Sequence, residues 1–462
     1  MNEERGVIVH PSSFILHPLL FFALLAGMTM SALGTEKDAA AGPPRMVFAH
    51  YMVCIPTYGG QSSLEDYQRE IKDAQQRGID GFALNCGNWT RREQYYKARS
   101  TLLYEAAKVL GTDFKLFFSA DGVSPEEAAD MVCSFYEHPN QFRCNGKPVL
   151  SSFAGTTAWG AKIVELVRAT GREVFFVPYY YPKKVTEMPQ QEHVDQVFND
   201  NPALDGFFFF GAAGTGEQIA RSNRLLAQKW LGADGKKVFM ASVTPYYRGF
   251  GGNYRCFETR GFQALAREWE GLIQDGATWV EIVTWNDWGE SSYLAPFGPP
   301  EQTKFWDGHW GPMLSHVAYL DASRYYIDWY KTGARPTITE DALYYFYRLH
   351  PKTAPGIVKP DDKARKTGLP GGADKLQDDV FVTLFLTAPA QLAIHSGETT
   401  KAFEVEAGVS HVEMPFAPGK QRFVLRRGEQ AVIDKTGEQE ISPTDAWGNF
   451  NYFGGSAKRP RQ

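Results

Sequence analysis

The stretch Trp279–Ser291, which reads WVEIVTWNDWGES, joins a mostly apolar run to a polar turn. Its first five residues are typical of a buried strand. The turn carries two carboxylates, Asp287 and Glu290, three residues apart among tryptophans and a glycine. A carboxylate pair beside indole rings is suited to cleavage of a glycosidic bond, in which one group protonates the leaving oxygen and the other activates water or attacks the sugar. A strand-end turn with solvated acids would have the same sequence, so the stretch alone leaves both interpretations open.

Seven similar apolar runs precede this one, and helical sequence lies between them. Continuous apolar runs are expected of parallel strands with both faces buried. About 240 residues of such alternation is the usual size of a (β/α)8 barrel. The sequence therefore predicts the α/β class and a (β/α)8 TIM barrel. A doubly wound open sheet is the rival, but no Gly-x-Gly-x-x-Gly follows the first run. The predicted strands are 46–54, 79–85, 114–119, 148–153, 173–178, 207–210, 238–242 and 279–284.

The composition changes after the predicted barrel, which spans 45–350 and includes helical sequence up to about Tyr347. Residues 351–376 are rich in Pro, Lys, Asp and Gly, which is typical of a linker. From 377 to 455 apolar and polar residues alternate, and this pattern predicts a C-terminal β-sandwich accessory domain. The basic tail, 456–462, is expected to be disordered.

The N-terminal 35 residues contain an apolar run over 14–26, followed by small residues at Ser31, Ala32 and Gly34. This order is typical of a cleaved signal peptide, and it predicts a secreted or periplasmic protein. The alternative is a retained membrane anchor, since the run approaches spanning length if Pro18 is tolerated.

Composition and cysteine spacing restrict the partners and cofactors. The net charge of the 462 residues is −5, so no basic field exists to hold nucleic acid. Aromatic residues reach 14%, which suits both packing and stacking on sugar faces. The five cysteines permit one or two disulfides, for example between Cys54 and Cys86, which both follow predicted strands. With no Cys-x-x-Cys and no His-Glu-x-x-His, we expect neither a metal nor another cofactor.

Polar and aromatic side chains occur at the C-terminal ends of the predicted strands, where barrel enzymes carry their active sites. We expect Asp287 and Glu290 to be catalytic, with the neighbouring indole rings raising the pKa of the acid by desolvation. Ordinary roles remain possible: Asp121 could be a turn residue, His50 a core histidine and Tyr179 a packing residue. The residues expected to bind substrate are Asp121, His50, Tyr51, Asn85, Trp89, Tyr179, Tyr246, Asn286, Trp288 and His316.

Five segments of the chain resemble glycoside hydrolase family 71, the α-1,3-glucanases or mutanases. They are FAHYMV (48–53), GIDGFALN (78–85), KLFFSAD (115–121), WNDWGES (285–291) and YYIDWYK (325–331). The resemblance spans roughly residues 46–350. It implies a (β/α)8 barrel followed by a β-sandwich, and hydrolysis of α-1,3-glucosidic bonds with inversion. The Asp-x-x-Glu pair of the family matches Asp287, expected to be the base, and Glu290, expected to be the acid; its strand-three Asp matches Asp121, expected to bind or support the substrate.

The leading hypothesis is thus an exported, inverting α-glucanase whose partner is an α-glucan polysaccharide or oligosaccharide. One alternative is an endo-α-mannosidase-like glycoside hydrolase, which would need a pocket that admits axial 2-hydroxyl groups. The other is a non-hydrolytic glycan-binding protein, which the intact Asp121, Asp287 and Glu290 disfavour. Contact with a membrane is expected only if the N-terminal segment is retained.

Overall fold

The computed structural model describes residues 43–180, 188–232, 236–250, 253–297, 313–354, 369–444 and 449–459. The predicted signal peptide lies outside these residues, as does most of the predicted linker. Within the described part of the chain, no helix combines the length and the apolar character needed to cross a membrane.

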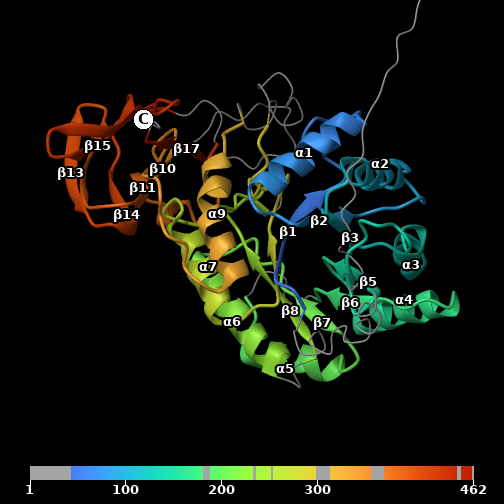
Figure 1. Cartoon of the computed structure of the whole chain (residues 1–462). Helices are drawn as coiled ribbons and strands as arrows, with labels where there is room; N and C mark the ends of the chain where they lie inside the picture. Colours follow the sequence, from blue (N-terminus) through green and yellow to red (C-terminus); the bar gives the residue numbers. More distant parts are fainter. Residues whose placement is uncertain are drawn as a thin grey trace, which may run out of the picture. The chain divides into compact units, whose positions relative to one another are not determined.

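Eight parallel strands form the main sheet (Figure 1), and all eight predicted strands are confirmed within a few residues. Their hydrogen-bonded order is β6-β5-β3-β2-β1-β9-β8-β7. Almost every strand residue is buried, which explains the continuous apolar runs. A short antiparallel strand, β4 (Arg143–Cys144), pairs with β5. The parallel strands are β1 (Met46–Met52), β2 (Gly81–Cys86), β3 (Lys115–Ala120), β5 (Lys147–Ser152), β6 (Phe175–Pro178), β7 (Gly206–Phe208), β8 (Val238–Val243) and β9 (Trp279–Ile282).

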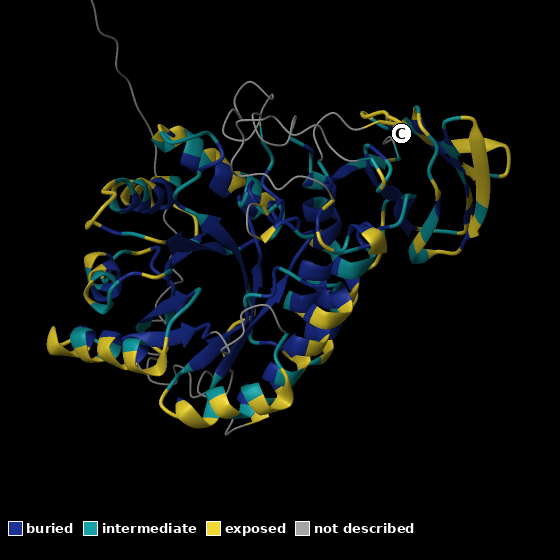
Figure 2. Cartoon of the chain, turned by 180° about the vertical axis from the view of Figure 1, so that it is seen from behind, coloured by how far each residue is buried: buried dark blue, intermediate teal, exposed yellow. Residues whose placement is uncertain are grey.

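Helices connect the strands and cover the outer face of the sheet, so their outward faces are exposed while the strands are buried (Figure 2). The starts of α1 and α3 follow from the sequence, because Ser63 with Asp66 and Ser124 with Glu127 form capping boxes. The helices are α1 (Leu64–Gln76), α2 (Tyr95–Leu110), α3 (Pro125–Ser134), α4 (Thr157–Ala169), α5 (Gln191–Asp200), α6 (Gly216–Gly232), α7 (Gln263–Gln274) and α9 (Val317–Thr332).

The sheet is strongly curled, and aromatic rings fill its concave side. Phe48 of β1 contacts the ring of Phe117 at a centroid distance of 4.9 Å and the ring of Trp279 at 6.5 Å. Strands β6 and β7 are the two ends of the hydrogen-bonded order, and no ladder joins them in the described residues. The structure therefore shows a mixed α/β fold with a curled parallel sheet, and closure into a full (β/α)8 barrel stays a prediction.

Two antiparallel sheets follow. One has the order β14-β11-β10-β17 and the other β13-β12-β15-β16. They share an apolar core in which the rings of Tyr345 and Phe423, one from each sheet, stack at 4.4 Å. The strands are β10 (Ala342–Arg348), β11 (Asp379–Leu386), β12 (Ala390–Ser396), β13 (Thr399–Val405), β14 (Gly408–Pro415), β15 (Gln421–Arg427), β16 (Gln430–Thr436) and β17 (Tyr452–Lys458).

Two predictions at the edges of this region are wrong. Residues 342–348 were expected to be helical but form β10, whose aromatic residues suit a buried strand. The tail was expected to be disordered, yet β17 continues to Lys458 and pairs with β10 along its whole length. The pairing needs small residues, because a Cβ atom on Gly455 would clash with the ring of Tyr345. Strands β10 and β17 are far apart in the sequence but adjacent in the sheet, and sequence periodicity does not reveal such a pairing.

Candidate active site

A hydrogen-bonded turn directly after β9 holds Asp287 and Glu290. The backbone N–H of Asp287 donates to Thr284 Oγ1 at 2.8 Å, and the backbone N–H of Glu290 donates to Asp287 Oδ1 at 3.1 Å. The Val283–Thr284 peptide bond that precedes the turn is cis. These contacts fix the two carboxyl-bearing residues relative to each other, at the C-terminal end of a strand.

Burial changes the acidity of both groups. Desolvation and, after it, the charge of the neighbouring Asp287 raise the pKa of Glu290 to about 8, although the Tyr247 hydroxyl and Arg255 oppose this rise. Desolvation also raises the pKa of Asp287, but hydrogen bonds from the backbone of Glu290 and Gly289 and the charge of His50 oppose this rise. The surroundings of the two carboxyls thus favour a proton on Glu290 and a negative charge on Asp287.

The loop after β8 supplies further residues around Glu290. Tyr247 donates its hydroxyl proton to Glu290 Oε1 at 2.9 Å, and Asn253 Nδ2 donates to the Tyr247 hydroxyl. The backbone N–H of Arg248 donates to the carbonyl oxygen of Glu290 at 2.9 Å. Sequence reasoning selected the neighbouring Tyr246, which lies elsewhere: its hydroxyl donates to the Phe450 carbonyl oxygen. The sequence contains no signal that shows which of these two adjacent tyrosines faces the carboxylates.

His50, Asn85 and Asp121 converge on the same site from β1, β2 and the end of β3. Asn85 Nδ2 donates to Asp121 Oδ2 at 3.4 Å. Desolvation raises the pKa of Asp121, while Asn85 and the charge of His50 lower it. His50 lies close enough to both Asp121 and Asp287 to act electrostatically on each of them. The structure therefore brings these three predicted residues together with the carboxylate pair.

Four other predicted substrate-binding residues are not brought to the carboxylates, and their polar groups are used within the protein. Tyr51 and Trp89 point toward the helices: Tyr51 donates to Glu70 of α1 at 3.0 Å, and Trp89 Nε1 donates to Asp130 of α3 at 2.7 Å. His316 bonds Tyr293 and Asn451 and is fully buried, with its pKa lowered to about 4 by desolvation. Tyr246 is the fourth. A strand alternates its side chains between two faces, so residues next to a site residue often face away from the site.

Asn286 and Trp288 belong to the turn, but their side chains brace the loop after β1. Asn286 accepts from the backbone N–H of Met52 at 2.7 Å and donates to the carbonyl oxygens of Met52 and Ile55. Trp288 Nε1 also donates to the Ile55 carbonyl oxygen. Tyr179 packs edge-on against the ring of Phe209 and is 8% exposed, so its contact with substrate stays a prediction.

Glu70 is a buried carboxyl that the sequence analysis missed. It accepts hydrogen bonds from Tyr51, from Thr57 Oγ1 at 2.6 Å and from Trp285 Nε1 at 2.8 Å. Desolvation raises its pKa to about 7 against these hydrogen bonds. Since Thr57 follows β1 and Trp285 follows β9, Glu70 ties together the two loops that carry the site. The only sequence signal was an acidic residue on the apolar face of α1.

The predicted disulfides are not formed, because all five cysteines are free. Cys54 is a neighbour of Asp287, which together with burial raises the pKa of its thiol to about 11. In the described parts of the chain, no group of three or more His, Cys, Asp or Glu side chains is placed to hold a metal ion.

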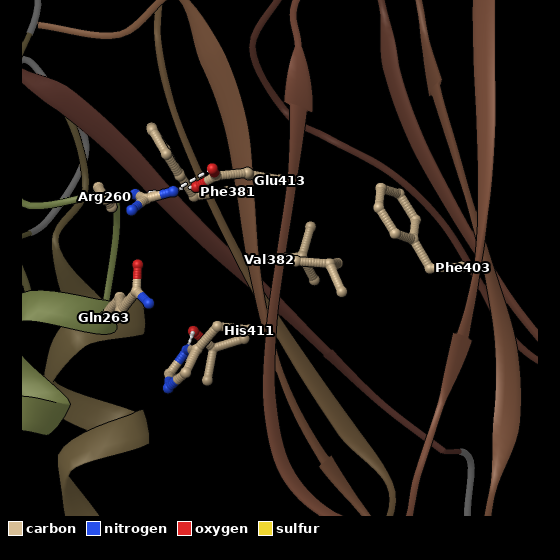
Figure 3. A pocket seen from close by; sticks show the side chains of 9 residues that line it. Arg260, Gln263, Phe381, Val382, Phe403, His411 and Glu413 are labelled. Atoms are coloured by element: carbon tan, nitrogen blue, oxygen red, sulfur yellow. Dashed lines mark hydrogen bonds and ion pairs between the residues drawn. The ribbon is translucent and has the colours of Figure 1, made fainter.

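A separate pocket of about 330 Å³ lies between the residues before and at the start of α7 and strands β11, β13 and β14 (Figure 3). Its charged side chains, Arg260 and Glu413, form an ion pair with each other. Gln263 and Phe403 also line it. None of the carboxylate-site residues lines this pocket, so the chemistry described above is elsewhere.

The chain is similar to known proteins in sequence and in structure. The family described as Glycosyl hydrolase family 71 matches residues 43–462. A mutanase of Penicillium rubens is 29% identical over 94% of this chain and 94% of its own length. A glucan endo-1,3-alpha-glucosidase of Schizosaccharomyces pombe is 27% identical over 95% of this chain and 98% of its own length. Among solved structures, an endo-alpha-mannosidase of Bacteroides thetaiotaomicron aligns with a TM-score of 0.49 and 18% identity, over 62% of this chain and 97% of that one.

Proposed function

The chain belongs to glycosyl hydrolase family 71, and we propose that it hydrolyses α-1,3-glucosidic bonds in α-glucan. Two fungal relatives, a mutanase and a glucan endo-1,3-alpha-glucosidase, support this bond specificity. The observation that carries the chemistry is the desolvated turn in which Asp287 and Glu290 have unequal surroundings. A pair of carboxyls with separated acidities supplies both an acid and a base at one pH.

In the proposed reaction Glu290 is the general acid and Asp287 the general base. Glu290, with its pKa raised to about 8, holds a proton at neutral pH and donates it to the glycosidic oxygen as the bond to the anomeric carbon breaks. Asp287 accepts a proton from water, whose oxygen attacks the opposite face of that carbon. The products are a new chain end with inverted configuration and a freed hydroxyl group.

The neighbouring residues suit substrate binding. Asp121, Asn85 and His50 present a carboxylate, an amide and an imidazole on the side of Asp287, and these groups hydrogen-bond well to sugar hydroxyls. Tyr179 would add an aromatic surface at the end of β6. We assign these four residues to substrate binding, and Asn286 and Trp288 to bracing of the turn that carries the catalytic pair.

The proposed enzyme is a (β/α)8 barrel with a β-sandwich, preceded by a signal peptide that directs export. Contacts between the two ends of the sheet support closure of the barrel. Tyr179, next to β6, touches the ring of Phe207 in β7 at 6.2 Å, and Asp205 before β7 accepts from the backbone N–H of Phe176 at 2.9 Å. Because β10 pairs with β11 and β17, we place the start of the sandwich near Ala342.

Reducing-sugar release from insoluble α-1,3-glucan tests the function, with β-1,3-glucan, α-1,4-glucan and α-mannan as controls. We expect release from α-1,3-glucan alone, and a loss of at least about 100-fold in Asp287→Asn and in Glu290→Gln. Release from α-mannan instead would indicate the mannosidase alternative. Glycan binding by folded wild-type protein without turnover would indicate a binding protein.

The stereochemistry is tested separately by proton NMR of the first products. An inverting enzyme that cleaves an α-linkage releases the β-anomer first. Initial accumulation of the α-anomer would contradict the assignment of Asp287 as a base and would make it a nucleophile.

A further inference from the structure

A polar layer lies inside the curled sheet, directly beneath the catalytic turn. Side chains two residues apart on a strand share a face. Phe48, Phe117 and Trp279 form an aromatic layer, and the residues two positions further along the same strands are His50, Ser119 and Glu281. Two residues beyond Ser119 is Asp121, and the residues that follow Glu281 lead into the turn that holds Asp287 and Glu290. Polar residues thus replace aromatic ones just below the site.

His50 and Glu281 form a hydrogen-bonded pair in this layer. The distance from His50 Nδ1 to Glu281 Oε1 is 2.5 Å, and both side chains are 0% exposed. The strands that carry them are adjacent and parallel, with Phe48 opposite Glu281 in the register. The backbone N–H of Trp285 donates to the His50 carbonyl oxygen at 2.7 Å, which joins β1 to the catalytic turn. The pair is therefore fixed to the same backbone that positions Asp287.

Each member of the pair also has a second polar atom that makes no hydrogen bond within the described residues. In the described part of the chain, His50 Nε2 and Glu281 Oε2 are buried and have no hydrogen-bond partner. Replacement of a buried polar pair by apolar residues of similar volume is often neutral or stabilising, so this pair is weak evidence for a role in stability. Unsatisfied buried polar atoms are unusual and call for a functional explanation. Nε2 lies on the side of the ring away from the bond to Glu281, and besides Glu281 the carboxyls of Asp121 and Asp287 sense the charge of the ring.

We propose that Glu281 is a positioning residue, which fixes the His50 imidazole so that Nε2 engages a sugar hydroxyl between Asp121 and Asp287. This inference rests on the proposed function and adds a residue to it. Nδ1 is held by Glu281, so the ring cannot rotate to present a different atom to the substrate. The ring of Phe210 limits its tilt further, since the two rings meet at 4.9 Å and 72°. Glu281 does not itself touch the substrate.

The test compares variants that keep different atoms of the pair. Glutamine at position 50 places its amide nitrogen near the position of Nε2, whereas asparagine places its amide near Nδ1. We expect His50→Gln to retain more kcat/KM on α-1,3-glucan than His50→Asn. We expect Glu281→Gln to lower kcat/KM by about 10-fold to 100-fold, the range for a misplaced group near the reacting atoms. Equal activity of the two His50 variants would overturn the proposal.

A double-mutant cycle separates positioning from a general structural role. If Glu281 acts through His50, then Glu281→Gln has no further effect on kcat/KM in a His50→Ala background. Additive losses would overturn the proposal, as would wild-type activity in Glu281→Gln. The matched control is Glu268→Gln, which changes another fully buried glutamate, one that accepts from the Thr244 N–H on the helix side of the sheet. We expect this control to shift the melting temperature but not kcat/KM.

The wild-type rate in the same assay separates a failure of the role of Glu281 from a failure of the proposed function. Turnover by wild type with no difference among the variants would remove only the role of Glu281. No turnover of α-1,3-glucan by folded wild type would remove the proposed function and, with it, this inference.

Discussion

The Tyr247 hydroxyl donates a hydrogen bond to Glu290 Oε1 at 2.9 Å, although the two residues follow different strands. Tyr247 follows β8 and Glu290 follows β9, so the contact exists only because these strands are neighbours in the sheet. The hydroxyl stabilises the ionised carboxylate and opposes the rise in the pKa of Glu290 that burial causes. Tyr247 therefore adjusts the pH at which the proposed acid loses its proton.

The pH dependence of kcat/KM should be bell-shaped. Glu290 must be protonated to act as the acid, so activity falls as pH rises through its pKa of about 8. Asp287 must be ionised to act as the base, so activity falls on the acid side at a pH above the ordinary range of an aspartate, whose pKa burial raises. Removing the hydroxyl in Tyr247→Phe should move the alkaline limb to higher pH. Initial rates in constant-ionic-strength buffers measure both limbs.

Tyr246→Phe is the control for this shift. It removes the bond to the Phe450 carbonyl oxygen, which costs stability but leaves the surroundings of Glu290 unchanged. An alkaline limb that stays in place in Tyr247→Phe, or that moves equally in both variants, would contradict the assignment of Glu290 as the acid.

Replacement of Asn286 by alanine should lower both stability and activity. Its amide makes three hydrogen bonds to the backbone of Met52 and Ile55, at the end of β1 and in the loop after it, and alanine removes all three. We expect a loss of about 1–3 kcal/mol in the free energy of unfolding, measured in urea, and a fall in kcat because the catalytic turn loosens.

Asn140→Ala is the matched control for Asn286→Ala. It removes two bonds to the Thr112 and Phe114 carbonyl oxygens, near the N-terminal end of β3. It should cost similar stability with kcat unchanged, and an equal loss of kcat in both variants would rule out a specific role of Asn286.

Glu70 should make the protein less stable as pH rises from about 4.5 to about 7. The folded protein keeps the Glu70 proton up to about pH 7, while the unfolded chain releases it near the ordinary value of 4.5. The folded state binds more protons in this window, so the free energy of unfolding decreases with pH. The expected decrease is on the order of 3 kcal/mol for this fully buried group. Glu70→Gln removes the titration, so its stability relative to wild type should improve across the window. A difference between the two proteins that is constant with pH would contradict the raised pKa.

Thiol titration should find five free cysteines in protein unfolded without a reducing agent. In the folded protein the thiols should react slowly, because burial raises the pKa of Cys144 to about 11 and that of Cys256 to about 12. Added reductant should leave the melting temperature unchanged. Fewer than five thiols in the unfolded, unreduced protein would show that a disulfide forms in the isolated protein.

Sequence reasoning located the strands because a strand buried on both faces must be apolar along its length. It also located Asp287, Glu290 and Asp121, because polar residues directly after such strands lie at one end of the sheet. It failed where a side chain had to be assigned to one of two faces. Tyr51, Trp89 and Tyr246 have the right composition for a sugar site, but they point toward the helices or toward β17.

The sequence by itself determined the positions of the strands along the chain, the family resemblance and the place of two carboxylates directly after a strand, since these depend on local patterns. Tertiary structure alone decided which groups surround them. The bond from Tyr247 to Glu290, the pair of His50 and Glu281, and the network of Glu70 join residues 43, 231 and up to 215 positions apart. Their pKa values depend on burial, and burial is a property of the packed fold, so no local pattern in the sequence contains it.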